Sequence, residues 1–492
     1  MDITSFFFIL FYVSLLILYY LTPGRFRWII LLAGSIVFYL LASNGLLLLY
    51  PLLSALATWA LTLAAGTAFF RTHSDLVRRC LLFLNLALLF GVLILLKYLR
   101  FLGGTALAPT GLSFYTFILA GYAIDVYNGL CEVQKNPLKA LLYGLFFPVS
   151  ISGPILKIGE TGKQFFEIHP LNYRNLTFGL QRMLWGFFEK LVLSERLAVL
   201  VRTIFAEPDV YTGAYVWFGG ICFSFRLYTD FKGCMDIVCG LCETLGIELP
   251  DNFDTPFLAK SISEYWRRWH ITLGVWMREH VFYPLLRTSL FNRFGIVLRQ
   301  KLGKKRGKQL TNFAAMLILW TAVGLWHGGA LHFLIGSGLL HFVYIVFGEI
   351  SLPLWKKLFV CLHIDTTTKF ANAVRIVRTF ILVTIGNIFF NAQTTDRALT
   401  MLASAFTVFN PQVLINGSLT ELGLDITELA ILVVSLTIFI VIDLQHKTIR
   451  ENIAARPIAL RWFLYFALLF YCILLGNYGP GYSAQEFIYQ GF

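Results

Sequence analysis

The sequence predicts an all-α polytopic membrane protein with about 11 transmembrane helices. Hydrophobic residues make up 58% of its 492 residues and charged residues only 14%, whereas soluble domains carry about 25% charged residues. Apolar runs that approach the length of a bilayer span recur along the chain. Several are shorter than the roughly 20 residues of a straight span. We therefore expect re-entrant and interfacial helices beside the spans, held where protein buries them.

The clearest apolar runs fall in the N-terminal, central and C-terminal parts of the chain. They are Phe6 to Leu21, Trp28 to Leu41, Leu46 to Phe70, Leu81 to Leu96, Ala214 to Phe225, Phe313 to Trp326, Leu331 to Phe347, Ile376 to Phe390, Leu429 to Ile442 and Trp462 to Leu475. No short repeat or soluble domain interrupts them. We expect a single integral membrane domain, 1–492, with a motif-rich core at about 109–345 and C-terminal spans at about 374–477.

Lysine and arginine gather in short segments between the runs, which predicts that these segments are cytoplasmic. The basic residues are Arg25 and Arg27, then Arg71, Arg78 and Arg79, then a basic loop over 287–308, and last Lys447, Arg450 and Arg456. The N-terminus and the tail 477–492, which has no lysine or arginine, are then expected outside. This bias accounts for most of the net charge of +13. Anionic lipid explains such segments better than nucleic acid does, so we expect no nucleic-acid partner.

Charged residues interrupt the apolar stretch from Phe225 to Asp236. Asp230, Lys232 and Asp236 stand within seven residues. The simpler interpretation is that Lys232 neutralises Asp230 or Asp236 inside a helix bundle. The functional interpretation is a polar wall of a substrate cavity.

Three cysteines of the same region have a C-x4-C-x2-C spacing, which also occurs in iron–sulfur proteins. They are Cys234, Cys239 and Cys242. A fourth ligand has no obvious candidate, and cysteine is a common small hydrophobe in protein cores. We therefore expect no metal site.

A capping box of Ser261 and Glu264 predicts the start of an amphipathic helix. Its apolar face has helical spacing and comprises Ile262, Tyr265, Trp266, Trp269, Leu273, Trp276 and Met277. Tryptophan and arginine together suit a helix at the membrane interface. His270 lies at the edge of this face, and the pattern leaves a structural and a catalytic role equally open.

A second histidine, His327, ends the apolar run 314–326 in the triplet Trp326-His327-Gly328. A polar ionisable side chain is costly in a membrane unless it has a partner or a function. Burial would keep the imidazole neutral, as a general base must be. The simpler alternative is a histidine that pairs across the bundle. His332 and His341 follow, and we interpret both as packing or interfacial residues.

These motifs, taken in order, resemble the membrane-bound O-acyltransferase family, in particular its bacterial branch of alginate O-acetylation and teichoic acid D-alanylation proteins. The resemblance covers roughly residues 1–480 and is strongest from 225 to 330. The matching stretches are 111–117 (GLSFYTF), 147–148 (FP), 152–154 (SGP), 186–190 (GFFEK), 230–231 (DF) with Gly233, 252–253 (NF), 256–257 (PF), 266–270 (WRRWH), 324–328 (GLWHG) and 478–482 (YGPGY).

The resemblance implies helices that enclose a transmembrane tunnel, with a donor entering from the cytoplasm and an acceptor from the other side. It implies that His327 is the catalytic residue and that His270 is the second family histidine. It places Trp326, Gly328, Trp269, Arg267, Arg268, Asp230, Asn252, Ser113 and Tyr115 in the tunnel or its support. No bound cofactor is implied, because acetyl-CoA or a carrier-protein thioester would be the donor substrate.

The chain departs from the family pattern at a few positions. Lys232 stands where a small residue is common, and Glu279-His280 replaces the usual Asp-Tyr. The D-alanylating members are usually shorter at the C-terminus, which favours acetyl transfer here. The resemblance also implies a separate extracytoplasmic acyltransferase partner and a cell-surface polysaccharide or teichoic acid as acceptor, in a bacterial cell membrane.

Other functions remain as alternatives. One is D-alanyl transfer from a carrier protein to teichoic acid. Another is a glycan-precursor transporter, which would often show inverted repeats; the sequence has no evident repeat. The last is a non-catalytic membrane scaffold, which would be favoured had the chain lost both histidines.

Overall fold

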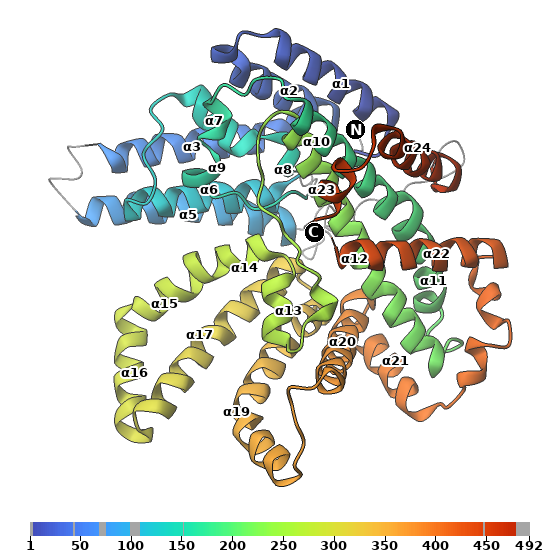
Figure 1. Ribbon diagram of the computed structural model, residues 1–492. Helices are drawn as coiled ribbons and strands as arrows, with labels where there is room; N and C mark the ends of the chain where they lie inside the picture. The colour runs from blue at the N-terminus through green and yellow to red at the C-terminus, as the bar shows by residue number, and fades with distance from the viewer. Residues whose placement is uncertain are drawn as a thin grey trace.

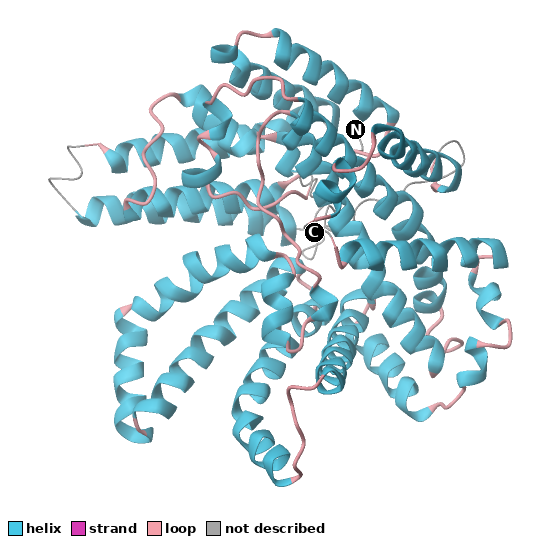
Figure 2. Ribbon diagram, in the orientation of Figure 1, coloured by secondary structure: helices cyan, strands magenta, loops and turns pink. Residues whose placement is uncertain are grey.

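The computed structural model describes residues 3–42, 45–67, 75–98, 109–150, 152–445 and 448–478. Within this part, the regular elements are helices and helical turns joined by loops (Figures 1 and 2). The helices of ten or more residues are α1 (Phe6–Leu21), α2 (Arg27–Ala42), α3 (Leu49–Gly66), α5 (Asp75–Tyr98), α6 (Leu112–Asn128), α10 (Tyr173–Phe187), α11 (Glu195–Ala206), α12 (Ala214–Thr244), α16 (Ser289–Leu302), α17 (Lys304–His327), α19 (Leu340–Cys361), α20 (Lys369–Asn391), α21 (Thr395–Thr407), α22 (Ile426–Asp443) and α24 (Ile458–Leu475).

The chain is a multi-pass membrane protein, and the predicted helical class is confirmed. Eight helical stretches in the described residues are long and apolar enough to cross a bilayer. Two shorter apolar helices accompany them, Phe6–Leu21 and Pro137–Ser150. The run from Ala214 to Phe225 is the first part of the longer helix α12.

The long helix α12 packs against α10, α11 and α20 and lies near the centre of the fold (Figure 1). Glycines bring α10 and α12 close together: a Cβ added to Gly186 would lie 2.5 Å from the carbonyl oxygen of Gly233. Small residues at such crossings let helix backbones approach each other in a membrane. After α10 the chain continues through a π-helical segment, η5 (Phe188–Ser194), into α11.

The sequence suggested that the basic segment 287–308 is a loop, and this prediction is wrong. The segment forms α16 and the first turns of α17, with a sharp turn at Gly303, where φ is 81°. The two helices make a hairpin whose turn points away from the rest of the fold, while α17 returns to the centre (Figure 1). Its charged side chains are exposed, except Arg299, which is half-buried, so the helix backbone forms without fully burying any of them.

Two of the basic segments that were predicted to be cytoplasmic meet at one end of the fold. Arg27 donates a hydrogen bond to the carbonyl oxygen of His169, and Gly246 approaches the His169 ring. Arg450 donates to Glu243 at 2.7 Å, close in sequence to Gly246. Arg71, Lys447, the end of the Leu46 to Phe70 run and the tail motif beyond Tyr478 lie outside the described residues.

Candidate active site

The helix that was expected over 262–277 is broken in the middle. It forms α13 (Ile262–Arg268) and α14 (Ile271–Met277), and His270 between them adopts a left-handed backbone with φ of 45°. The break arises because the chain pairs with the loop 252–254: Asp254 N donates to Arg268 O at 2.9 Å, and Ile271 N donates to Asn252 O at 3.0 Å. The start of α13 is as predicted, since Ser261 Oγ accepts from Glu264 N at 3.2 Å.

Left-handed backbone is uncommon for a residue other than glycine and often marks a functional constraint. It places the ring of His270 in the interior, where 2% of the residue is exposed. Asn252 Oδ1 lies 3.4 Å from His270 Nδ1, and the ring of Phe231 packs edge-on at 4.9 Å between centroids.

His327 is the last residue of α17, and it too is 2% exposed. The ring of Trp326 links the two histidines, with centroids 4.7 Å from His327 and 5.9 Å from His270. Phe390 of α20 closes another side of His327 at 5.3 Å. The structure therefore brings together the two histidines that the sequence singled out, although they lie in different elements.

Lys97, near the end of α5, contacts this cluster. Its ammonium donates to the carbonyl oxygen of Trp326 and lies 5.6 Å from the centroid of the Trp326 ring. A cation beside the last carbonyls of α17 complements the negative end of the helix dipole. No local pattern in the sequence connects Lys97 with Trp326, so this contact could not be predicted from the sequence.

His341 is a packing residue, as predicted, but it packs in the same neighbourhood. Its ring meets Trp266 edge-on at 4.9 Å and stacks on Trp320 at 5.8 Å. His332 packs on its neighbour Phe333 at 4.2 Å.

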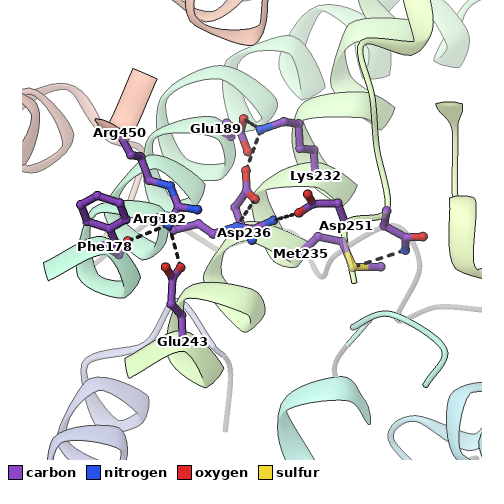
Figure 3. Close-up of polar contacts among 10 residues, drawn as sticks. Phe178, Arg182, Glu189, Lys232, Met235, Asp236, Glu243, Asp251 and Arg450 are labelled. Atoms are coloured by element: carbon purple, nitrogen blue, oxygen red, sulfur yellow. Dashed lines mark hydrogen bonds and ion pairs between the residues drawn. The ribbon is translucent and has the colours of Figure 1, made fainter. Parts of the chain in front are cut away.

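A network of alternating charged side chains links α10, α12 and the loop that holds Asn252 (Figure 3). Lys232 Nζ donates to Glu189 Oε1 and to Asp236 Oδ2, each at 2.6 Å. Arg182 then donates to Asp236 at 2.8 Å and to Asp251 at 2.6 Å. Buried charges require such pairing. This network of charges ties Asp251, and hence its neighbour Asn252, to two helices of the core.

Of these pairs, the one between Lys232 and Asp236 was predicted from the sequence, as one of two alternatives. Glu189, Arg182 and Asp251 were not predicted, because they come from other elements. Asp230 pairs instead with Lys190 of η5, at 2.8 Å, and also accepts from Ser194 at 3.1 Å.

A cavity of about 570 Å³ lies beside this network of charges. Its polar wall includes Arg182, Lys232, Asp236 and Asn252, and its apolar wall comes from α22, α24 and the short helix α23 (Ile449–Ala454). The volume falls in the range of small-molecule sites, about 300–1,000 Å³. Neither histidine lines the cavity, but Asn252 does, and Asn252 contacts His270.

The other residues implied by the family pattern lie in several surroundings. Trp269 is buried among aromatic rings, including Phe253 at 5.0 Å. Arg268 donates to Asp254 O at 3.2 Å and so holds the loop. Arg267 is exposed and has no hydrogen bond or ion pair with the described residues.

The remaining implied residues lie at two helix ends. Gly328 ends α17 against the ring of Phe333. Ser113 and Tyr115 are buried at the start of α6, away from the cavity lining. Helix α6 reaches the histidine cluster through Phe117, whose ring lies 5.9 Å from that of Trp326.

Glu279 and His280, which depart from the family pattern, each have a partner. Glu279 pairs with Lys157 at 2.6 Å; burial opposes the charge of Lys157, but this pair outweighs it and raises the pKa of the lysine above its usual value. His280 Nε2 lies 3.1 Å from Asp125 Oδ1 and its Nδ1 lies 3.2 Å from Trp276 O. The substituted pair lies in η7 (Arg278–Phe282), which continues α14, and it fastens η7 to α6 and to the loop at Lys157.

Comparison with known proteins supports the resemblance that the motifs predicted. Residues 131–298 match the model of MBOAT, the membrane-bound O-acyltransferase family. The chain is similar to this family over the matched region, which holds η5, α12, the 251–254 loop and His270. The predicted resemblance is confirmed.

Curated relatives agree with this similarity. The "Probable alginate O-acetylase AlgI" of Pseudomonas aeruginosa is 30% identical over 336 residues, which cover 67% of this chain and 58% of the relative. The "Peptidoglycan O-acetyltransferase" of Helicobacter pylori is 30% identical over 47% of this chain and 46% of its own length. The "Teichoic acid D-alanyltransferase" of Bacillus subtilis is 30% identical over 47% of this chain and 57% of its own length. The chain thus spans about half of the length of these relatives.

Proposed function

We propose that this chain transfers an acyl group, most simply acetyl, from a cytoplasmic thioester across the membrane to a hydroxyl group. The hydroxyl belongs to a cell-surface polysaccharide or to a partner protein. The observation that carries the proposal is the cluster His270, Trp326 and His327, which is buried in a chain similar to an acyltransferase family.

In this proposal His327 is the general base. Its neutral imidazole takes the proton of the acceptor hydroxyl while the oxygen attacks the thioester carbonyl. The carbon–sulfur bond then breaks, and the thiolate leaves with the proton that the imidazolium returns. General base catalysis of this kind contributes about 10²–10⁴-fold, and holding both substrates in one site adds the advantage of proximity. His270 assists from the other side of Trp326.

The cavity beside Asn252 is our candidate for the approach of the donor. Its lining includes α23, and Arg450 of this helix lies at the end of the fold where Arg27 also lies. We assign this end to the cytoplasm by the positive-inside rule. The N-terminus and the C-terminal tail are then extracytoplasmic, in a bacterial cell membrane.

The orientation of α17 fits transfer across the membrane. The helix begins at the exposed basic turn, spans 24 residues and ends at His327. At about 1.5 Å per residue this separation is roughly 35 Å. A basic cytoplasmic turn would leave His327 well inside the membrane or beyond its middle, accessible to an acceptor from the other side.

We propose that the transferred group is acetyl rather than D-alanyl. The alginate O-acetylase relative aligns with 67% of the chain, whereas the teichoic acid D-alanyltransferase relative aligns with 47%. We further propose that a separate extracytoplasmic protein receives the acyl group, with a polysaccharide or teichoic acid as final acceptor. Acetyl-CoA or a carrier-protein thioester serves as donor substrate, with no bound cofactor.

The test uses purified protein in liposomes with radiolabelled acetyl-CoA, and it follows thioester loss and label on an added polysaccharide or partner-protein hydroxyl. His327→Gln should abolish both, whereas the matched control His332→Gln, five residues further on, should retain them. D-alanyl-loaded carrier protein is the second donor to supply. If the wild type consumed neither donor, the acyltransferase proposal would be overturned in favour of a scaffold or a transporter.

A further inference from the structure

Asn252 fixes the identity of the atom that faces His270. Its Oδ1 accepts from the backbone N–H of Thr272 at 2.9 Å and from Thr272 Oγ1 at 2.9 Å. A backbone N–H can only donate, so the atom in this position must be the oxygen of the amide and not its nitrogen. The same oxygen lies 3.4 Å from His270 Nδ1.

A carbonyl oxygen cannot donate a hydrogen bond. If the neutral imidazole carried its hydrogen on Nε2, the lone pair of Nδ1 would face the lone pairs of Asn252 Oδ1. We infer that Asn252 is a positioning residue that holds His270 in the Nδ1–H tautomer, so that Nε2 carries the basic lone pair. This inference deepens the proposed function and rests on it for its catalytic meaning.

Asn252 is itself held in place. Its backbone oxygen accepts from Ile271 N at 3.0 Å, and its Nδ2 donates to Met235 Sδ at 3.4 Å. The preceding residue, Asp251, is bound to Arg182 at 2.6 Å. Asn252 is 3% exposed. The amide therefore has little freedom to rotate and lose its orientation toward His270.

This arrangement explains the left-handed backbone of His270. A continuous helix would carry His270 on past the loop, and its Nδ1 would not meet Asn252. The break instead aligns three consecutive residues, His270, Ile271 and Thr272, so that each contacts Asn252. In this geometry Nδ1 faces Asn252 Oδ1, and the basic lone pair of the ring is on Nε2.

The first experiment determines which ring nitrogen of His270 carries the hydrogen, and it does not require acyl transfer activity. Protein with ¹⁵N-labelled histidine is reconstituted in liposomes for solid-state NMR, and the His270 signals among nine histidines are assigned by their loss in His270→Gln. We expect a protonated Nδ1 and an unprotonated Nε2. A protonated Nε2 in the wild type would overturn the inference, even if acyl transfer were established.

Variants then test the role of Asn252. Asn252→Asp keeps the acceptor oxygen and should keep the Nδ1–H signal, while Asn252→Leu should lose it and lower kcat by about 10-fold or more; in a serine protease triad the wrong tautomer costs up to about 10⁴. Thr272→Val is the matched control, because it removes one contact of Asn252 but leaves Asn252 Oδ1 facing His270. If Thr272→Val lost the Nδ1–H signal of His270 as fully as Asn252→Leu, Asn252 would be a structural residue only. Absence of transfer by the wild type with the expected tautomer would instead count against the proposed function alone.

Discussion

Lys97 of α5 donates a hydrogen bond to the carbonyl oxygen of Trp326, the residue that directly precedes His327. Two distant helices are therefore joined at the end of α17, where the proposed base lies. The ammonium also faces the indole ring of Trp326, at 5.6 Å from its centroid. The residue before His327 is thus contacted by a side chain from α5.

Replacement of Lys97 by methionine should disturb this arrangement. The carbonyl of Trp326 would lose its donor and the helix end its cation, each of which contributes about 1 kcal/mol or more. We expect roughly 10-fold slower transfer, since a displacement near 1 Å can cost about 10²-fold. The exposed Lys135→Met is the control in the same liposome assay. Equal rates for Lys97→Met and the wild type would mean that the end of α17 is held without Lys97.

Lys232 is the next residue whose loss has a clear outcome. It is the shared cation of Glu189 and Asp236, both of which are buried. Lys232→Met would leave the buried carboxyl of Glu189 without its cation, and breaking a buried pair in this way costs about 3–5 kcal/mol. We expect a marked drop in thermal unfolding temperature. The double variant Lys232→Met, Glu189→Gln should recover part of the loss, because it also removes the unpartnered carboxyl.

A double variant no more stable than Lys232→Met would show that the pair with Glu189 contributes little. The comparison is informative because Asp236 keeps Arg182 as a second partner in both variants. Thermal unfolding of purified protein in detergent would supply the measurement.

The sequence predicted the membrane class, the positions of most spans and the two central histidines, because these depend on composition and on local motifs. It could not predict that the helix after Ser261 breaks at His270. The apolar spacing of Trp266, Trp269 and Leu273 continues across the break, whereas the cause of the break is pairing with 252–254, which is a tertiary contact.

The charged network shows the same limit. Lys232 and Asp236 are four residues apart on one helix, a spacing at which side chains meet, so their pairing could be predicted. Arg182 and Glu189 reach Asp236 and Lys232 from another helix, and no spacing in the sequence encodes that contact. The helical hairpin at 287–308 was missed for a different reason, since its run of charges is typical of a loop.

The close crossing of α10 and α12 predicts a steric effect at Gly186. An added methyl group would meet the backbone of Gly233, which cannot move aside without shifting α12. Overpacking of this kind typically costs about 1–3 kcal/mol, so Gly186→Ala should lower the unfolding temperature. The matched control is Gly91→Ala on α5, where nothing lies within 4 Å of the new Cβ. There alanine should be neutral or stabilising by up to about 1 kcal/mol.

The basic hairpin offers a test of what its charges do. Lys304 and Lys305 are exposed at the turn between α16 and α17, and no ion pair joins them to other described residues. If they serve only to keep this turn cytoplasmic, Lys304→Gln with Lys305→Gln should leave kcat and KM for the donor within about twofold in oriented liposomes, since surface charges contribute about 0–1 kcal/mol. Protease accessibility of the turn would report its side of the membrane independently. A large rise in KM with unchanged orientation would contradict a purely topological role, and it would indicate that the turn docks an anionic donor, such as the phosphates of coenzyme A or an acidic carrier protein.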